Sequence, residues 1–287
     1  MNYFTNSYVR FSFKLVFTVC VLTIIFKSVP FNDVVFTISH THIQWLILGT
    51  IFFILSKYFS SIRLYLFFKN AKKQIDSVYN MKLYILGMFY NFFLPTGIGG
   101  DAYKVIKIHN DYSYPIKNIA TILLLDRLSG LVALINLAVL CSLYFISAVQ
   151  GITLFIILVL GNIIYPFIIR KYIAIHIISL QTELLSLLVQ LSQCVCAFCI
   201  LRAIDIATNQ LIYIVVFLIS SVASLFPLSI GGLGAREYTF MLAATHFNLH
   251  IEKAISIGFL FYIISLFVSS FGSYFIFKPI NSLKTHA

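Results

Sequence analysis

The chain has 287 residues, of which 60% are hydrophobic and only 10% are charged, whereas a soluble domain carries about 25% charged residues. This composition excludes a soluble globular protein, and the continuous apolar runs argue against a β-barrel, whose strands would alternate. Lys and Arg outnumber Asp and Glu by 20 to 9, but most of them lie in short loops, where they set topology and contact anionic lipid. We therefore expect one all-α domain over residues 1–287, an integral membrane bundle of about eight helical segments.

The N-terminal part of the chain contains two expected spans. Residues 11–29 form an apolar run after Arg10, and residues 43–62 form a second run that Arg63 ends. The segment 30–42 between them holds no Lys or Arg, whereas the segment 63–82 holds several. Because short cytoplasmic loops are rich in Lys and Arg, we expect the N-terminus and segment 63–82 in the cytoplasm. Segment 30–42 is then a polar loop on the outside.

The next apolar helix, residues 82–94, is too short to cross a bilayer, which takes about 20 residues. It breaks at residues 95–100 and resumes as residues 101–109, and basic residues flank both sides. We therefore expect residues 83–109 to form a re-entrant hairpin that enters from the cytoplasm and returns. Asp101 is placed as the N-cap or first-turn acid of the returning half.

Residues 116–146 form a long apolar segment that contains L-L-L-D-R-L-S-G. Asp126 and Arg127 are adjacent in it, and charges inside a membrane helix usually have partners in the bundle or a cavity. Adjacent helical residues do not face each other, so we expect different partners for the two, or one partner and one substrate. A structural ion pair or a position near the cytoplasmic interface remains the alternative.

Further spans are expected at residues 152–169, 184–201, 211–226 and 255–277, with a short helix at residues 235–247. The basic residues that follow the last span place the C-terminus in the cytoplasm as well. Cys194, Cys196 and Cys199 lie in one apolar run without His or acid at ligand spacing, so we interpret them as packing residues and expect no metal.

Two stretches share the pattern P-x-x-I-G-G. They are N-F-F-L-P-T-G-I-G-G-D at residues 91–101 and F-P-L-S-I-G-G-L-G-A-R-E at residues 226–237. Proline removes a backbone donor, and glycine pairs permit positive φ and close backbone approach, so each stretch interrupts a helix. A matched pair of interrupted hydrophobic segments indicates the binding site of a transporter. Two ordinary loops between spans are the alternative.

These two stretches and L-L-L-D-R-L-S-G, in this order, resemble the lysylphosphatidylglycerol synthase transmembrane-region family, and the resemblance covers nearly the whole chain. That region is the flippase half of the multiple-peptide-resistance-factor proteins and also occurs alone. The soluble synthase half is absent here, so lysyl transfer is not implied. Family members often carry Arg a few positions after G-G-D, where this chain has Lys104, which keeps the charge without the bidentate fork.

The resemblance implies a bundle with re-entrant segments that handles a lipid with an anionic head group. Helices that begin at the glycines would aim free N–H groups at a phosphate, and Arg or Lys would add charge-assisted bonds. We further expect Asp126 or Glu237 to neutralise an arginine of the other block while the site is empty. The candidate substrate-binding residues are Asn91, Pro95, Gly99, Gly100, Asp101, Lys104, Asp126, Arg127, Pro227, Gly231, Gly232, Gly234, Arg236 and Glu237.

The sequence thus predicts a flippase or transporter of the cell (inner) membrane for phospholipids or polyprenyl-phosphate-linked lipids. It carries no G-x-x-x-x-G-K-[ST], so we expect no bound ATP and no cofactor. Expected partners are membrane lipids and envelope-biosynthesis enzymes, not nucleic acid. One alternative is a non-catalytic partner in an envelope glycan or lipid pathway. Another is a polyprenyl-phosphate-dependent glycosyltransferase, for which the outside loops offer only Asp33, Asp205 and Glu252 as carboxylates.

Overall fold

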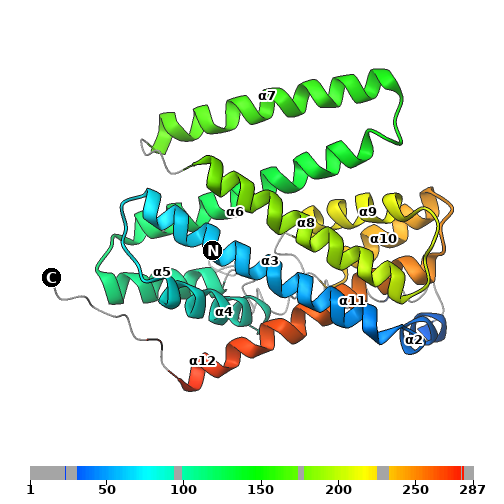
Figure 1. Ribbon diagram of the computed structural model, residues 1–287, viewed down its shortest axis with the longest axis horizontal. Helices are drawn as coiled ribbons and strands as arrows, with labels where there is room; N and C mark the ends of the chain where they lie inside the picture. Colours follow the sequence, from blue (N-terminus) through cyan, green and yellow to red (C-terminus); the bar gives the residue numbers. More distant parts are fainter. Residues whose placement is uncertain are drawn as a thin grey trace, which may run out of the picture.

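The computed structural model describes residues 31–93, 99–173, 178–224 and 233–278, together with Thr23 and Ile280. Within these residues the regular secondary structure is helical, with no strand, which confirms the all-α class (Figure 1).

Some features expected from the sequence lie outside this part of the chain. The expected first span, residues 11–29, lies outside the described part of the chain except for Thr23. Four candidate site residues are the others: Pro95, Pro227, Gly231 and Gly232.

The helices follow one order twice, in residues 43–142 and again in residues 180–270. In each copy a long helix is followed by two shorter helices that pack against each other, and then by a second long helix. The first copy consists of α3 (Ile43–Asn70), α4 (Ser77–Phe93), α5 (Gly99–Tyr112) and α6 (Ile116–Ser142), and the second of α8 (Leu180–Ala203), α9 (Gln210–Ala223), α10 (Ala235–His246) and α11 (Ile251–Ser270). The other elements are α2 (Phe31–Ser39), α7 (Ala148–Ile173), the 3₁₀-helix η2 (Phe271–Ser273) and α12 (Tyr274–Phe277).

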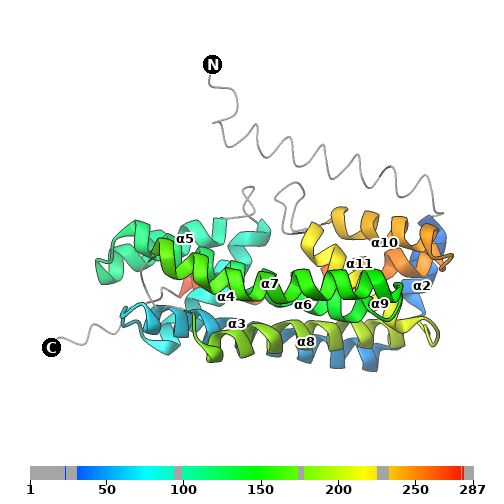
Figure 2. The ribbon, with the colours of Figure 1, turned by 90° about the horizontal axis from the view of Figure 1, so that it is seen from above.

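The two helices that begin the copies, α3 and α8, lie side by side and run antiparallel (Figure 1). The N–H of His42, just before α3, donates to the carbonyl of Ala203 at the end of α8 (2.9 Å). At the other end, Asn70 Nδ2 donates to Ser179 Oγ, just before α8 (3.3 Å). Two antiparallel copies of one helix order form an inverted repeat, an arrangement that many transporters share. The α4–α5 pair lies towards one end of the molecule and the α9–α10 pair towards the other (Figure 2).

Small residues permit the close contact between α3 and α8. A Cβ added to Gly49 of α3 would lie 3.3 Å from Cβ of Cys199 and 3.4 Å from the carbonyl oxygen of Cys196, both on α8. Both cysteines are buried, and Cys196 belongs to an apolar core cluster of the bundle. They therefore pack α3 against α8, as the sequence predicted.

Within the described ranges, α3, α6, α7, α8 and the run from α11 to α12 are long and apolar enough to cross a membrane. Helix α7 is exposed along most of its length and lies at the edge of the bundle (Figure 1). It is joined to α6 by reciprocal amide hydrogen bonds between Asn136 and Asn162 (2.8 and 2.9 Å). An apolar helix that exposes its side chains in this way fits a lipid environment, so the chain is a multi-pass membrane protein.

Two expected boundaries are wrong. Arg63 does not end the second span, because α3 continues to Asn70 and Arg63 is buried inside it. The segment 30–42 is not a loop, because most of it forms α2, which packs on α11 through the buried side chains of Val34 and Ile255.

Candidate functional site

The first interrupted stretch is held by close contact between α4 and α5. A Cβ on Gly100 would overlap the carbonyl of Gly87 on α4, and a Cβ on Gly87 would overlap the side chain of Lys104. Asn91 Oδ1 on α4 accepts a hydrogen bond from the N–H of Gly100 (3.0 Å). Gly99 and Gly100 are buried in the first turn of α5 without positive φ, so close approach of the two backbones explains them.

The second interrupted stretch leads into α10 through Gly234, whose φ of 91° suits glycine. The N–H of Gly234 donates to Glu237 Oε2 (2.6 Å). Glu237 is buried as the third residue of α10, a position from which glutamate reaches back to the start of its own helix. Asn91 and Glu237 therefore accept hydrogen bonds from the N–H groups that the sequence predicted would bind a phosphate.

Asp101 binds two cations from different helices. Its carboxylate forms one ion pair with Nε of Arg127 on α6 and another with Nζ of Lys104, one turn further along α5 (3.4 Å). Lys104 Nζ also lies 4.5 Å from the centre of the Tyr84 ring on α4, a cation–π contact. One carboxylate thus links α5 to α6 and leaves one positive charge uncompensated.

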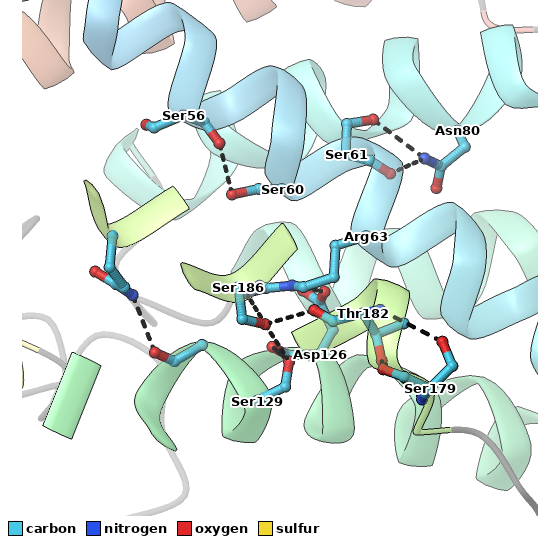
Figure 3. Close-up of polar contacts among 12 residues, drawn as sticks. Ser56, Ser60, Ser61, Arg63, Asn80, Asp126, Ser129, Ser179, Thr182 and Ser186 are labelled. Atoms are coloured by element: carbon cyan, nitrogen blue, oxygen red, sulfur yellow. Dashed lines mark hydrogen bonds and ion pairs between the residues drawn. The ribbon is translucent and has the colours of Figure 1, made fainter. Parts of the chain in front are cut away.

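Asp126 has a partner that the sequence reading missed. Arg63 Nε on α3 donates to Asp126 Oδ1 (2.7 Å), and Arg63 Nη1 donates to Ser186 Oγ on α8 (3.1 Å). Ser186 Oγ in turn donates to Ser129 Oγ on α6 (3.2 Å), so the network joins three helices (Figure 3). Arg63 and Asp126 are both buried. The signal for Arg63 was the apolar run that resumes directly after it, at residues 64–68.

Arg236 on α10 forms no ion pair with an acid among the described residues. Its guanidinium lies 4.5 Å from the centre of the Phe261 ring on α11, and hydroxyl groups orient it without neutralising its charge. They belong to Ser220 (3.4 Å), Ser221 (3.1 Å) and Ser224 (3.2 Å).

Two cavities open beside these groups inside the bundle. The Asp101 cavity has a volume of about 310 Å³ and is lined by Asp101, Asp126 and Arg127 among others. The Arg236 cavity has a volume of about 330 Å³ and is lined by Arg236 and two of its serines, Ser221 and Ser224. The residues that line both cavities are Lys57, Tyr84, Met88, Asn91, Leu134, Gln190 and Gln193. The two interrupted stretches therefore contribute to adjoining spaces.

The pairing pattern confirms one expectation and corrects another. Asp126 and Arg127 have different partners, as their adjacency on a helix required. The expected neutralisation of an arginine by an acid of the other block is wrong for both acids. Asp126 pairs with Arg63, and Glu237 accepts from its own helix start. The pair that does join two blocks is Asp101 with Arg127.

The sequence profile of the lysylphosphatidylglycerol synthase TM region matches residues 11–272, nearly the whole chain. The chain belongs to this family. No curated protein matches the sequence. Membership in the lysylphosphatidylglycerol synthase TM family confirms the resemblance and indicates a membrane protein of a lipid or envelope pathway.

Proposed function

We propose that the chain is a flippase or transporter, not an enzyme, and that it moves a lipid with an anionic, phosphate-bearing head group across the inner membrane. The observation that carries this proposal is the pair of adjoining cavities inside an apolar bundle. They are lined by five cationic side chains but only two carboxylates. A polar space with excess positive charge, formed by two interrupted segments of an inverted repeat, suits an anionic head group.

The charged side chains, and not the helix ends, supply the attraction in this proposal. Arg127 forms an ion pair with Asp101, so an arriving phosphate competes with a carboxylate for it. Arg236 is held only by hydroxyl groups and rings, so a phosphate binds it without displacing an acid. A head group that passes from one cavity to the other thus meets cations along its whole path.

A lipid-translocation assay tests the proposal. The protein is reconstituted into vesicles that carry head-group-labelled phospholipids or polyprenyl phosphates in one leaflet, and transfer to the other leaflet is followed over time. We expect transfer of anionic lipids that Arg236→Gln reduces about tenfold or more and that Lys117→Gln, at an exposed lysine, leaves intact. Absence of transfer for every lipid, combined with co-purification of an envelope enzyme, would support a non-catalytic partner instead.

The orientation is part of the same proposal, with both termini in the cytoplasm. Single cysteines at Asn70 and Asn110, in a cysteine-free background, report on the α4–α5 pair. A membrane-impermeant thiol reagent is expected to label both from the cytoplasmic side, because the chain enters and returns between them. Labelling from opposite sides would make the α4–α5 segment a full crossing.

A further inference from the structure

The chain leaves two cations without a carboxylate in one cavity. All nine Asp and Glu residues lie in the part of the chain that the structure describes, and none of them forms an ion pair with Lys57 or Arg236 there. Lys57 Nζ instead lies 4.4 Å from the centre of the Phe53 ring. Both cations line the Arg236 cavity, whose walls contain no acid among the described residues. An uncompensated charge in such a place is expensive unless an anion neutralises it.

An apolar groove adjoins this cavity. It has a volume of about 500 Å³ and runs along α3, α4 and the end of α11 with η2. Ile51, Ile54 and Tyr58 on α3 are exposed along it. Lys57, Tyr84 and Met88 line both the groove and the Arg236 cavity, so the two spaces meet at the Lys57 side chain. An apolar channel that opens on the lipid-facing surface and ends at a cation has the polarity of a single lipid molecule.

We propose that Lys57 and Arg236 together bind the phosphate of a lipid whose acyl chain lies in this groove, and that the site selects head groups of net negative charge. The inference rests on the proposed lipid-transport function and assigns the substrate class to its site. The occupant is a lipid phosphate and not a soluble phosphate, because the groove would otherwise expose apolar side chains next to a polar cavity. Lys57 supplies a point charge at the mouth, and Arg236 supplies a planar fork deeper in the bundle.

The selectivity follows from the state of the neighbouring carboxylates. A head group that carries its own ammonium group needs a free acid near its phosphate. Asp126 is bound by Arg63, and Asp101 is shared between Lys104 and Arg127. Neither carboxylate is therefore free for a cationic or zwitterionic head group, and among the described residues no other carboxylate lines either cavity. An ammonium group beside the phosphate would be repelled by Lys57 and Arg236.

Lipid binding in detergent tests this inference without requiring transport. The purified protein is mixed with equal amounts of dioleoyl phosphatidate, phosphatidylglycerol and phosphatidylcholine, and native mass spectrometry measures which lipid it retains. We expect phosphatidate to be retained most and phosphatidylcholine least. Lys57→Gln and Arg236→Gln are each expected to weaken phosphatidate binding about tenfold, the loss of one charge-assisted bond. Lys117→Gln is the matched control at an exposed lysine and should change nothing.

The groove is tested separately by a bulky substitution. Ile54→Trp places a large ring where the acyl chain would lie and is expected to reduce binding of dioleoyl phosphatidate severalfold. Ile157→Trp is its control, since Ile157 is an equally exposed isoleucine on α7 away from the groove. Glycerol 3-phosphate, which has no acyl chain, should compete weakly. If it competes as well as the lipid does, the groove assignment is overturned.

The outcomes separate this inference from the transport proposal. Equal retention of phosphatidylcholine and phosphatidate, or unchanged binding in monodisperse Lys57→Gln and Arg236→Gln variants, overturns the inference even if vesicles show lipid transfer. The predicted binding preference without any transfer in vesicles supports the inference as a lipid site and overturns transport.

Discussion

The α4–α5 and α9–α10 pairs are built by the same backbone device and differ in their charges. In both, the second helix carries an acid as its third residue: Asp101 in α5, which begins at Gly99, and Glu237 in α10, which follows Gly234. The carboxylate of Asp101 forms ion pairs with Arg127 and Lys104. The carboxylate of Glu237 accepts a hydrogen bond from the N–H of Gly234, just before its own helix. The first pair therefore sets one carboxylate against two cations, whereas Arg236 in the second forms no ion pair among the described residues.

The lengths of the two acidic side chains explain why Glu237 binds the start of its own helix and Asp101 does not. Glutamate at the third helical position has the reach to bond the start of its own helix, as in a capping box. Aspartate is one methylene shorter, and here Asn91 already accepts a hydrogen bond from the N–H of Gly100, the second residue of α5. The carboxylate of Asp101 is thus left for cations of α5 and α6. Glu237 binds the start of its own helix instead, and Arg236 forms no ion pair among the described residues.

The largest effect should come from a break in the first pair. Gly100→Val places a branched side chain against the carbonyl of Gly87, and neither backbone can withdraw without separating α4 from α5. We expect little or no monodisperse protein in detergent. Gly161→Val is the control, because a Cβ there meets nothing within 4 Å. Normal yield of the Gly100 variant would show that the two helices are not in close contact.

The next largest effect should come from the buried ion pair that joins α3 to α6. Asp126→Ala leaves Arg63 buried without its carboxylate, and removal of one partner of such a pair costs about 3–5 kcal/mol. The expected result is a clear fall in the melting temperature of the purified protein. Asp205→Ala removes an acid from the exposed pair with His42 and should leave the melting temperature nearly unchanged. Equal melting temperatures would mean that the Arg63–Asp126 pair contributes little.

The sequence predicted the helices well where apolar length and glycine set their ends. The short helix expected at 235–247 is α10 (Ala235–His246). α4 ends at Phe93 and α5 begins at Gly99, close to the break expected at residues 95–100. The positive-inside rule failed at Arg63, because it treats each arginine as a loop residue. An arginine with a buried acid on another helix stays inside a span, and that acid, Asp126, is remote in the sequence.

The candidate site could be predicted only in part for the same reason. The motifs identified Asp101, Arg127 and Arg236, which line the two cavities. They did not identify Lys57, because a single lysine in an apolar helix resembles a span end until the packing of α3 against its neighbours is known. Pairings across helices also depend on side-chain reach, which sequence spacing does not contain. The sequence therefore predicted which residues belong to the site better than it predicted which residues they pair with.

Arg127 and Arg236 are both proposed to bind the lipid, and their substitution should affect transfer to different degrees because their partners differ. Arg127→Ala removes a cation that is already neutralised by Asp101, and Arg236→Ala removes one that is not. We expect both variants to fold, with lipid transfer in vesicles reduced severalfold by the first and about tenfold or more by the second. Arg236→Lys should recover only part of the activity, since Lys lacks the planar fork. If folding yield and transfer fall together, the arginines are structural.

The smallest effect is expected at Glu237, and a matched pair of variants makes it informative. Glu237→Gln keeps an oxygen that can accept from Gly234 and removes a charge from the first turn of α10, where an acid contributes about 0.3–1 kcal/mol. In the described part of the chain no cation forms an ion pair with Glu237, so removal of its buried charge offsets this loss. The melting temperature should therefore change little, and lipid binding should not change.

Asp101→Asn is the equivalent substitution in the first pair, and its consequences should be larger. It removes the carboxylate that holds Arg127 and Lys104, and thereby frees two cations beside the Asp101 cavity. We expect a lower melting temperature together with tighter binding of phosphatidate, because the lipid no longer competes with an acid for Arg127. Similar effects of the two variants would mean that both acids serve only their own helices, and the electrostatic difference between the two halves would then have no functional role.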